Sequence, residues 1–183
     1  VQGSGDPSQT VGSLPSSYRL MFGGSSVSIS DSKFTDNQSP MAIIDYTNSA
    51  RSLKIKNSNI ENSEGGLFTN YHQVSIENSK INSNHSLHKQ YYPLSNTSGG
   101  AGSSPFGVGL SYYGTCLEGS SLELINSEIS DNLNSISSNA GIVALFCPRI
   151  IKVSGSTIAN NIVRPGSDFP KYSDLGSPGF WAT

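Results

Sequence analysis

Apolar residues recur along this chain in a short phrase: apolar, polar, apolar, polar, then a turn pair and a further apolar residue. In one copy Val74, Ile76 and Ile81 are the apolar positions, and Asn78-Ser79 is the turn pair. Two apolar residues two positions apart face the same side of a strand, and Asn tolerates the left-handed conformation of a tight turn. Each phrase therefore predicts a strand, a turn and a second strand that face one core.

Five copies of the phrase align by hand, at residues 27–37, 53–63, 74–84, 122–132 and 151–161. Successive copies begin 26, 21, 48 and 29 residues apart. A third apolar stretch follows each copy, and residues 17–24 have the character of such a stretch from a preceding repeat. Periods of roughly 20 to 50 residues are typical of solenoids and propellers. The Gly-His and Trp-Asp signatures of a WD-type propeller blade are missing from this sequence.

The repeat predicts an all-β fold, a parallel β-helix (solenoid) with three short strands per coil, about five to six coils and no helical cap. We expect a single segment over residues 1–183, with an irregular lead-in at 1–16 and loop insertions at 85–105 and 162–178. Equivalent residues of stacked coils lie over one another, so Asn amides at the first turn can hydrogen-bond along the stack. This predicted turn column consists of Asp31, Asn57, Asn78, Asn126 and Gly155, and a column of serines lies beside it.

The composition is polar but carries little charge. The 183 residues include 36 Ser and 16 Asn, only 13% are charged, and the net charge is −2. The basic residues are scattered, which argues against a nucleic-acid partner. The longest apolar run, Gly141 to Cys147, is far shorter than the ~20 residues of a membrane span. His85 and His88 fall in a predicted loop with no cysteine nearby, so we expect no metal and no cofactor.

The repeat resembles the right-handed parallel β-helix superfamily, the pectate-lyase-like fold, and most closely the repeats of polymorphic outer-membrane proteins and related adhesins. Their Phe-x-x-Asn tetrapeptide is matched at 34–37, and with Ile in place of Phe at 81–84, 129–132 and 158–161. Residues 65–67 and 140–142 approximate their Gly-Gly-Ala-Ile tetrapeptide. The resemblance implies right-handed coils and a secreted or surface-displayed protein.

Enzymes of that fold mostly cleave acidic polysaccharides, with clustered carboxylates and either a basic residue or a Gly-His-Gly loop. This chain has no Asp-Asp pair, no Gly-His-Gly and no Asn-Thr-Asp. Asp36 and Asp131 recur at one position of the repeat, where Asn160 also lies, which is typical of solvated coil edges. We therefore expect no enzymatic activity. The alternative is a carbohydrate-active enzyme, lyase-like or hydrolase-like, or a sugar-binding module.

The two insertions occur at the same point of the repeat, and binding residues concentrate in such loops. Their aromatic and polar side chains suit a glycan or a surface protein as partner. The alternative is that these side chains cover apolar surface of the coils. The candidate binding residues are His88, Lys89, Tyr91, Tyr92, Asp168, Phe169, Lys171 and Tyr172.

Two further features favour an extracellular or cell-surface location. Cys116 and Cys147 each follow a third apolar stretch in neighbouring coils, so their Cα atoms can approach the ~5.5 to 6 Å of a disulfide. Two unpaired thiols are the alternative. Asn37, Asn84 and Asn96 begin Asn-x-Ser/Thr sequons and are candidate glycosylation sites.

These features together predict an extracellular structural or adhesive segment, part of a surface protein, fibre or appendage, whose loops on one face serve recognition. Neither end of the sequence shows a polar cap or a capping helix. An open solenoid end exposes unpaired strand edges and apolar core. We expect further coils, or copies of the same or a related protein, to abut these ends.

Overall fold

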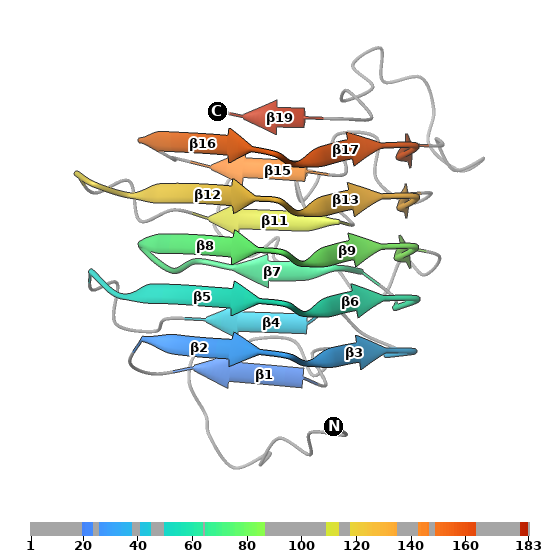
Figure 1. Cartoon of the computed structure of the whole chain (residues 1–183), viewed down its shortest axis with the longest axis horizontal. Helices are drawn as coiled ribbons and strands as arrows, with labels where there is room; N and C mark the ends of the chain where they lie inside the picture. Colours follow the sequence, from blue (N-terminus) through green and yellow to red (C-terminus); the bar gives the residue numbers. More distant parts are fainter. Residues whose placement is uncertain are drawn as a thin grey trace, which may run out of the picture.

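The computed structural model describes residues 20–23, 26–37, 41–44, 50–63, 65–86, 109–113, 118–134, 143–146, 149–163 and 180–182. These residues form parallel β-strands in four sheets, and no helix occurs among them. The prediction of an all-β chain is therefore confirmed. Figure 1 shows the strands of successive repeats stacked one above another, from blue at the N-terminal end to red at the C-terminal end.

Three large sheets collect equivalent strands from successive repeats. Sheet B contains the first strand of each phrase: β2 (Val27–Ser30), β5 (Ser52–Lys56), β8 (Gln73–Glu77), β12 (Ser121–Ile125) and β16 (Ile150–Ser154). Sheet C contains the second: β3 (Lys33–Thr35), β6 (Asn59–Glu61), β9 (Lys80–Asn82), β13 (Glu128–Ser130) and β17 (Thr157–Ala159). Sheet A contains the third apolar stretches: β1 (Leu20–Gly23), β4 (Met41–Ile44), β7 (Leu67–Thr69), β11 (Leu110–Tyr113), β15 (Val143–Phe146) and β19 (Phe180–Ala182).

The register between repeats does not slip, although their spacing in sequence varies. Leu53 pairs with Val74, Val74 with Leu122, and Leu122 with Ile151. Intervals of 21, 48 and 29 residues therefore end in the same alignment. Because pleated side chains alternate between faces, this constant register keeps every apolar position on the same side of its sheet.

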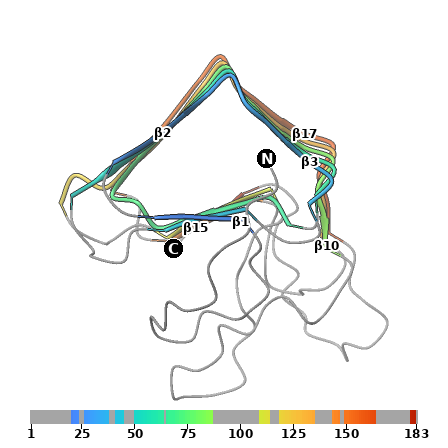
Figure 2. The ribbon, with the colours of Figure 1, turned by 90° about the horizontal axis from the view of Figure 1, so that it is seen from below.

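The core lies between sheets A, B and C, which follow three sides of a triangle when the stack is seen in Figure 2. Alternate residues of β5, β8 and β12 in sheet B are buried, as are the central residues of β3, β6, β9 and β13 in sheet C. The fully buried apolar side chains include Leu53, Ile55, Ile60, Val74, Ile76, Ile81, Leu122 and Leu124, and from sheet A Met41, Ile43, Leu67, Leu110 and Tyr112. The period-two pattern of the phrase thus corresponds to one interior face.

A fourth, short sheet corrects the prediction of three strands per repeat. Sheet D consists of β10 (His85–Ser86), β14 (Leu133–Asn134) and β18 (Ile162–Val163). The first two residues of each predicted insertion, 85–105 and 162–178, are therefore strand. Two residues are too few to show periodicity. The N–H group of the first residue in each strand donates to a carbonyl at the second turn of the previous repeat, as Leu133 does to Asn84 at 2.8 Å. This short pairing depends on the stack and not on local sequence.

Candidate functional site

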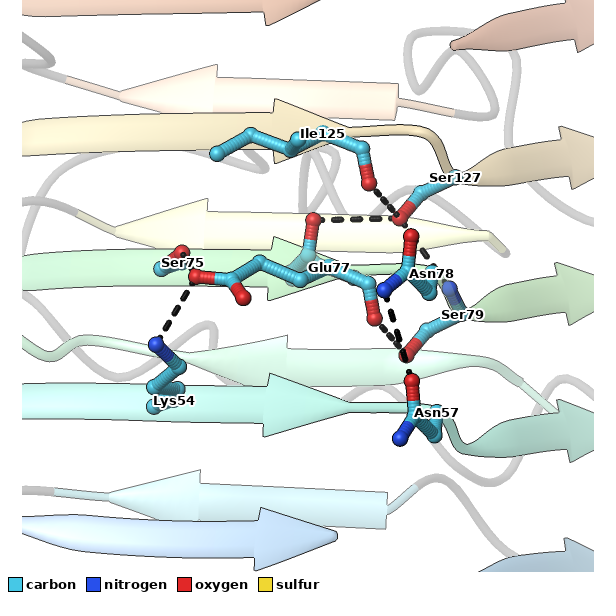
Figure 3. A network of polar contacts seen from close by, with 9 residues as sticks. Lys54, Asn57, Ser75, Glu77, Asn78, Ser79, Ile125 and Ser127 are labelled. Atoms are coloured by element: carbon cyan, nitrogen blue, oxygen red, sulfur yellow. Dashed lines mark hydrogen bonds and ion pairs between the residues drawn. The ribbon is translucent and has the colours of Figure 1, made fainter. Parts of the chain in front are cut away.

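The first turn of each phrase forms an outer column on the surface of the stack. Its five residues, Asp31, Asn57, Asn78, Asn126 and Gly155, all have left-handed φ angles, between 47° and 59°. The Nδ2 group of Asn57 donates to Asp31 Oδ1 at 3.0 Å, and that of Asn78 donates to Asn57 Oδ1 at 3.4 Å. Figure 3 shows Asn57 and Asn78 one above the other, each following the end of its strand. The residues predicted to form a turn column do occupy equivalent turns.

Gly155 gives the last turn of this column a different chemistry. Its φ of 59° favours glycine, and a Cβ atom at this position would collide with the Oδ1 atom of Asn126. The Asn126 carboxamide therefore lies where a side chain of residue 155 would begin. The outer column begins with Asp31, whose carboxylate can only accept hydrogen bonds. It ends at Gly155, which has no side chain.

A serine column runs beside the outer column, inside the turn. In the first four repeats the backbone N–H of the serine donates to the Oγ of the serine in the next repeat, at 3.0 to 3.2 Å. Each hydroxyl in turn donates to the carbonyl two residues before it, as Ser79 does to Glu77 at 2.7 Å. The five serines are Ser32, Ser58, Ser79, Ser127 and Ser156. Buried backbone N–H groups at the first turn are satisfied in this way.

The second turn carries an inner asparagine column that the sequence interpretation did not locate. Asn84, Asn132 and Asn161 follow residues with left-handed φ, and Asn84 and Asn132 are completely buried. Asn132 Oδ1 accepts both the backbone N–H and the Nδ2 group of Asn84, each at 3.0 Å. Its own Nδ2 donates to the Ile81 carbonyl at 2.9 Å and to Asn161 Oδ1 at 3.0 Å. The amide stacking predicted for the first turn is thus most complete at the second.

The sequence signal for this inner column was the Asn that ends four of the five phrases. Ser63 takes its place in the second repeat and accepts the backbone N–H of Asn37 at 3.2 Å through Oγ. A polar residue at that position, five residues after each turn serine, is the regularity that identifies the column. In the sequence these asparagines also end the Phe-x-x-Asn tetrapeptide and its Ile variants, and Asn37 and Asn84 begin sequons.

The packing of Asn84 argues against the predicted glycosylation there. Its Nδ2 group, where an N-linked glycan would be attached, donates to Asn132 Oδ1 and to the Ile60 carbonyl at 3.1 Å. A glycan would replace one of these hydrogens and would need space at a side chain with no exposed surface. Asn37, at the first repeat, is half-buried, and its Nδ2 donates to Ser63 Oγ at 3.3 Å. Asn96 lies outside the described residues.

Ion pairs cross between neighbouring repeats on the outer faces of sheets B and C. In each of them a lysine of one strand meets a glutamate of the adjacent strand. They are Lys33–Glu61 at 2.5 Å, Lys54–Glu77 at 2.9 Å, Lys80–Glu128 at 3.1 Å and Lys152–Glu123 at 2.8 Å. Exposed pairs of this kind contribute little individually, about 0.2 to 1 kcal/mol.

In two of these ion pairs the pKa of the glutamate is lowered. The hydrogen bond from Lys54 lowers the pKa of Glu77, with a smaller contribution from Ser75 (Figure 3). Hydrogen bonds from Ser130 and Lys80 lower the pKa of Glu128. These charges therefore lie along the junctions between repeats and favour their alignment.

A buried tyrosine ties sheet A to the segment that leads into sheet B. Tyr112 is fully buried, and its hydroxyl donates to the His72 carbonyl at 3.0 Å. Burial raises the pKa of Tyr112 to about 12. The hydroxyl is thus held in its neutral form and has a structural role.

The C-terminal end of sheets B and C exposes apolar side chains. Ile151 and Val153 of β16 are 41% and 48% exposed, and Ile150 of the same strand is exposed to a similar degree. Leu122 and Leu124, which hold the positions of Ile151 and Val153 one repeat earlier, are buried. β16 and β17 are the outermost strands of their sheets. This end of the stack, formed by Ile150–Asn161, is here named the end face.

The predicted binding residues in the loops all lie outside the described residues: His88, Lys89, Tyr91, Tyr92, Asp168, Phe169, Lys171 and Tyr172. Cys116 and Cys147 lie outside them too, so the disulfide stays a prediction. In the part of the chain that the structure describes, no three His, Cys, Asp or Glu side chains are grouped so that they could hold a metal ion. The same part contains no helix that is long and apolar enough to cross a membrane.

No family model matches the sequence, and no curated protein or solved structure is significantly similar to it.

Proposed function

We propose that this chain is a segment of a right-handed parallel β-helix with a structural or adhesive role at an extracellular surface. The observation that carries the proposal is the use made of the recurring polar residues. Asn and Ser side chains bond one repeat to the next at both turns, through an outer, a serine and an inner column. The recurring Asn and Ser residues thus stabilise the stack of repeats. An elongated structural element requires such stabilisation along its whole length.

The outer surface supports the same function. Sheets B and C carry lysine–glutamate pairs between neighbouring strands, and Asp36 and Asp131 lie exposed at the second turn with left-handed φ angles. A regular, evenly charged surface suits a spacer, while recognition falls to the two insertions, where the eight candidate binding residues occur. In this proposal the stack is the rigid support and the loops are the adhesive part.

The extracellular location rests on sequence features, namely the spacing of Cys116 and Cys147 and the sequons at Asn37 and Asn96. We expect a membrane-impermeant amine reagent to label the protein on intact cells of its source. Lys33, Lys54, Lys80 and Lys152 are suitable targets, since their side chains are 50% to 66% exposed. Mass spectrometry of non-reduced peptides from the labelled fraction would then show a Cys116–Cys147 link.

The matched comparison is the same labelling after permeabilisation, with a cytosolic marker protein as the control for leakage. Labelling of these lysines only in permeabilised cells, together with free thiols at both cysteines, contradicts the extracellular proposal. Labelling on intact cells supports it and gives material for tests of adhesion. In those tests Tyr91→Ser with Tyr92→Ser should abolish retention on the glycan or protein surface that holds the wild type, and Ser75→Ala, on sheet B, should not.

A further inference from the structure

Among the residues that the structure describes, no further repeat lies beyond the end face, whereas every earlier repeat has a following one. In the four junctions between repeats, the backbone N–H of the outer-column residue donates to a carbonyl of the next repeat, as Asn126 does to Ser154 at 2.8 Å. The N–H of the turn serine donates to the next serine Oγ, and the inner-column N–H donates to the next Asn or Ser side chain. By the same geometry the N–H groups of Gly155, Ser156 and Asn161 are directed to a following repeat. No described residue accepts them.

The first repeat offers the complementary groups. Ser32 Oγ and Asn37 Oδ1 occupy the positions from which Ser58, Ser79 and Asn132 accept hydrogen bonds from the repeat before them. Neither atom accepts a hydrogen bond from a described residue. Ser32 and Asn37 are five residues apart, as Ser156 and Asn161 are. Both acceptors can therefore meet both donors in a single parallel register.

The apolar side chains match in the same register. Ile29 and Phe34 face the core of the first repeat and are 8% and 6% exposed. Placed one repeat beyond β16 and β17, they would cover Val153 and Ile158, as Leu124 covers Ile76 within the chain. Such a junction would remove from water the apolar surface that the end face exposes.

We propose that the end face binds residues Val27–Asn37 of a second copy of this chain, so that copies join head to tail in parallel register. The proposal rests on the proposed structural function and deepens it, because it identifies the contact by which the segment would extend. A head-to-tail contact is heterologous, and one that does not close into a ring gives an open filament. Backbone hydrogen bonds provide the affinity of such strand addition, and the turn side chains fix its register.

Sheet A determines how the junction closes. This sheet has six strands and sheets B and C have five each, because β1 precedes β2 and β19 follows β15. When β2 of the second copy adds to β16, the second copy's β1 and the first copy's β19 fall on the same position beside β15. One of the two must be displaced. Removal of residues 180–183 should therefore strengthen the association.

The test is sedimentation velocity of the 183-residue chain across a concentration series. Val153→Lys places an ammonium group in the junction, while in the free chain this half-exposed side chain reaches water. Ser154→Lys is the matched control, since it adds the same charge to the neighbouring exposed position on the other face of β16. We expect wild type and Ser154→Lys to form larger species as concentration rises. Val153→Lys should lower the association constant by at least about tenfold.

Ser32→Ala tests the opposite end, because it removes the acceptor that the junction requires. It should also weaken association, and an equimolar mixture of Val153→Lys and Ser32→Ala should stop at dimers, since one intact end remains on each. Association of Val153→Lys equal to that of wild type overturns the proposal, and so does a wild type that stays monomeric at every concentration. A folded monomer that is labelled on intact cells contradicts only the head-to-tail association and leaves the proposed function standing. A chain without β-structure by circular dichroism contradicts the structural proposal as well.

Discussion

Truncation of Asn132 should be the most damaging single change in the inner column. The Asn132→Ala substitution removes the acceptor of the Asn84 backbone N–H and of one Asn84 Nδ2 hydrogen, and it removes the donor to the Ile81 carbonyl. All three groups are buried, because Asn84 has no exposed surface and Ile81 has almost none. A buried polar group left without a partner costs about 1 to 3 kcal/mol.

The three groups together give an expected loss of about 3 kcal/mol or more in the free energy of unfolding. For a domain whose total stability is about 5 to 15 kcal/mol, this is a large fraction. Urea unfolding followed by far-ultraviolet circular dichroism should show it as a lower midpoint with an unchanged slope. Asn132→Ser should lose less, because Ser63 already serves as the acceptor at this position in the second repeat.

Asn82→Ala is the control for the same truncation in the same part of the stack. Asn82 lies on β9, and its Oδ1 atom is buried without a hydrogen-bond partner among the described residues. Its removal should change the unfolding free energy by less than about 1 kcal/mol. Equal losses from Asn132→Ala and Asn82→Ala would refute the reasoning, because they would show that the hydrogen bonds of the column add nothing to the packing.

Four other measurements follow from the turns, the ion pairs and the buried tyrosine. Ser79→Ala removes an Oγ that accepts one backbone N–H at 3.0 Å and donates to a carbonyl at 2.7 Å, so urea unfolding should show a loss of about 1 to 3 kcal/mol. Asn78 has a φ of 47°, so Asn78→Ala should lower stability by about 1 kcal/mol while Asn78→Gly stays close to wild type in the same assay. The lowered pKa of Glu77 adds stability that is present above the ordinary value of 4.5 and is lost as pH falls through the lowered pKa. Lys54→Met should flatten that part of the stability–pH curve. The raised pKa of Tyr112 adds stability that is complete below pH 10.0 and is lost as pH rises to about 12; Tyr112→Phe should remove this loss.

The strand–turn–strand unit could be predicted from sequence because its causes are local. Val74, Ile76 and Ile81 alternate with polar residues, and Asn78 takes the left-handed conformation that its side chain tolerates. The recurrence of the phrase five times then implied parallel stacking, because only stacking buries the apolar face of each copy. The residues of the outer column and of the serine column could be predicted from the sequence for the same reason.

The tertiary structure decided which turn carries the buried asparagines. Sequence periodicity shows that two polar positions recur, but burial depends on which turn bends toward the core, and that depends on three sheets packed around it. Asn84 and Asn132 are therefore inside, whereas Asn57 and Asn78 lie at the surface. The sequon at Asn84 likewise contains no information about the exposure of its amide, which only the packed sheets determine.

By itself the sequence determined the all-β class, the phrase, its register and the residues of the outer and serine columns, because period-two alternation and turn propensity act over a few neighbouring residues. Only the tertiary structure decided the two-residue strands of sheet D, the inner asparagine column and the exposure of Ile151 and Val153 at the end face. Each of these depends on whether a repeat has a neighbour on one side or on both. That is a property of the stack, and no single phrase contains it.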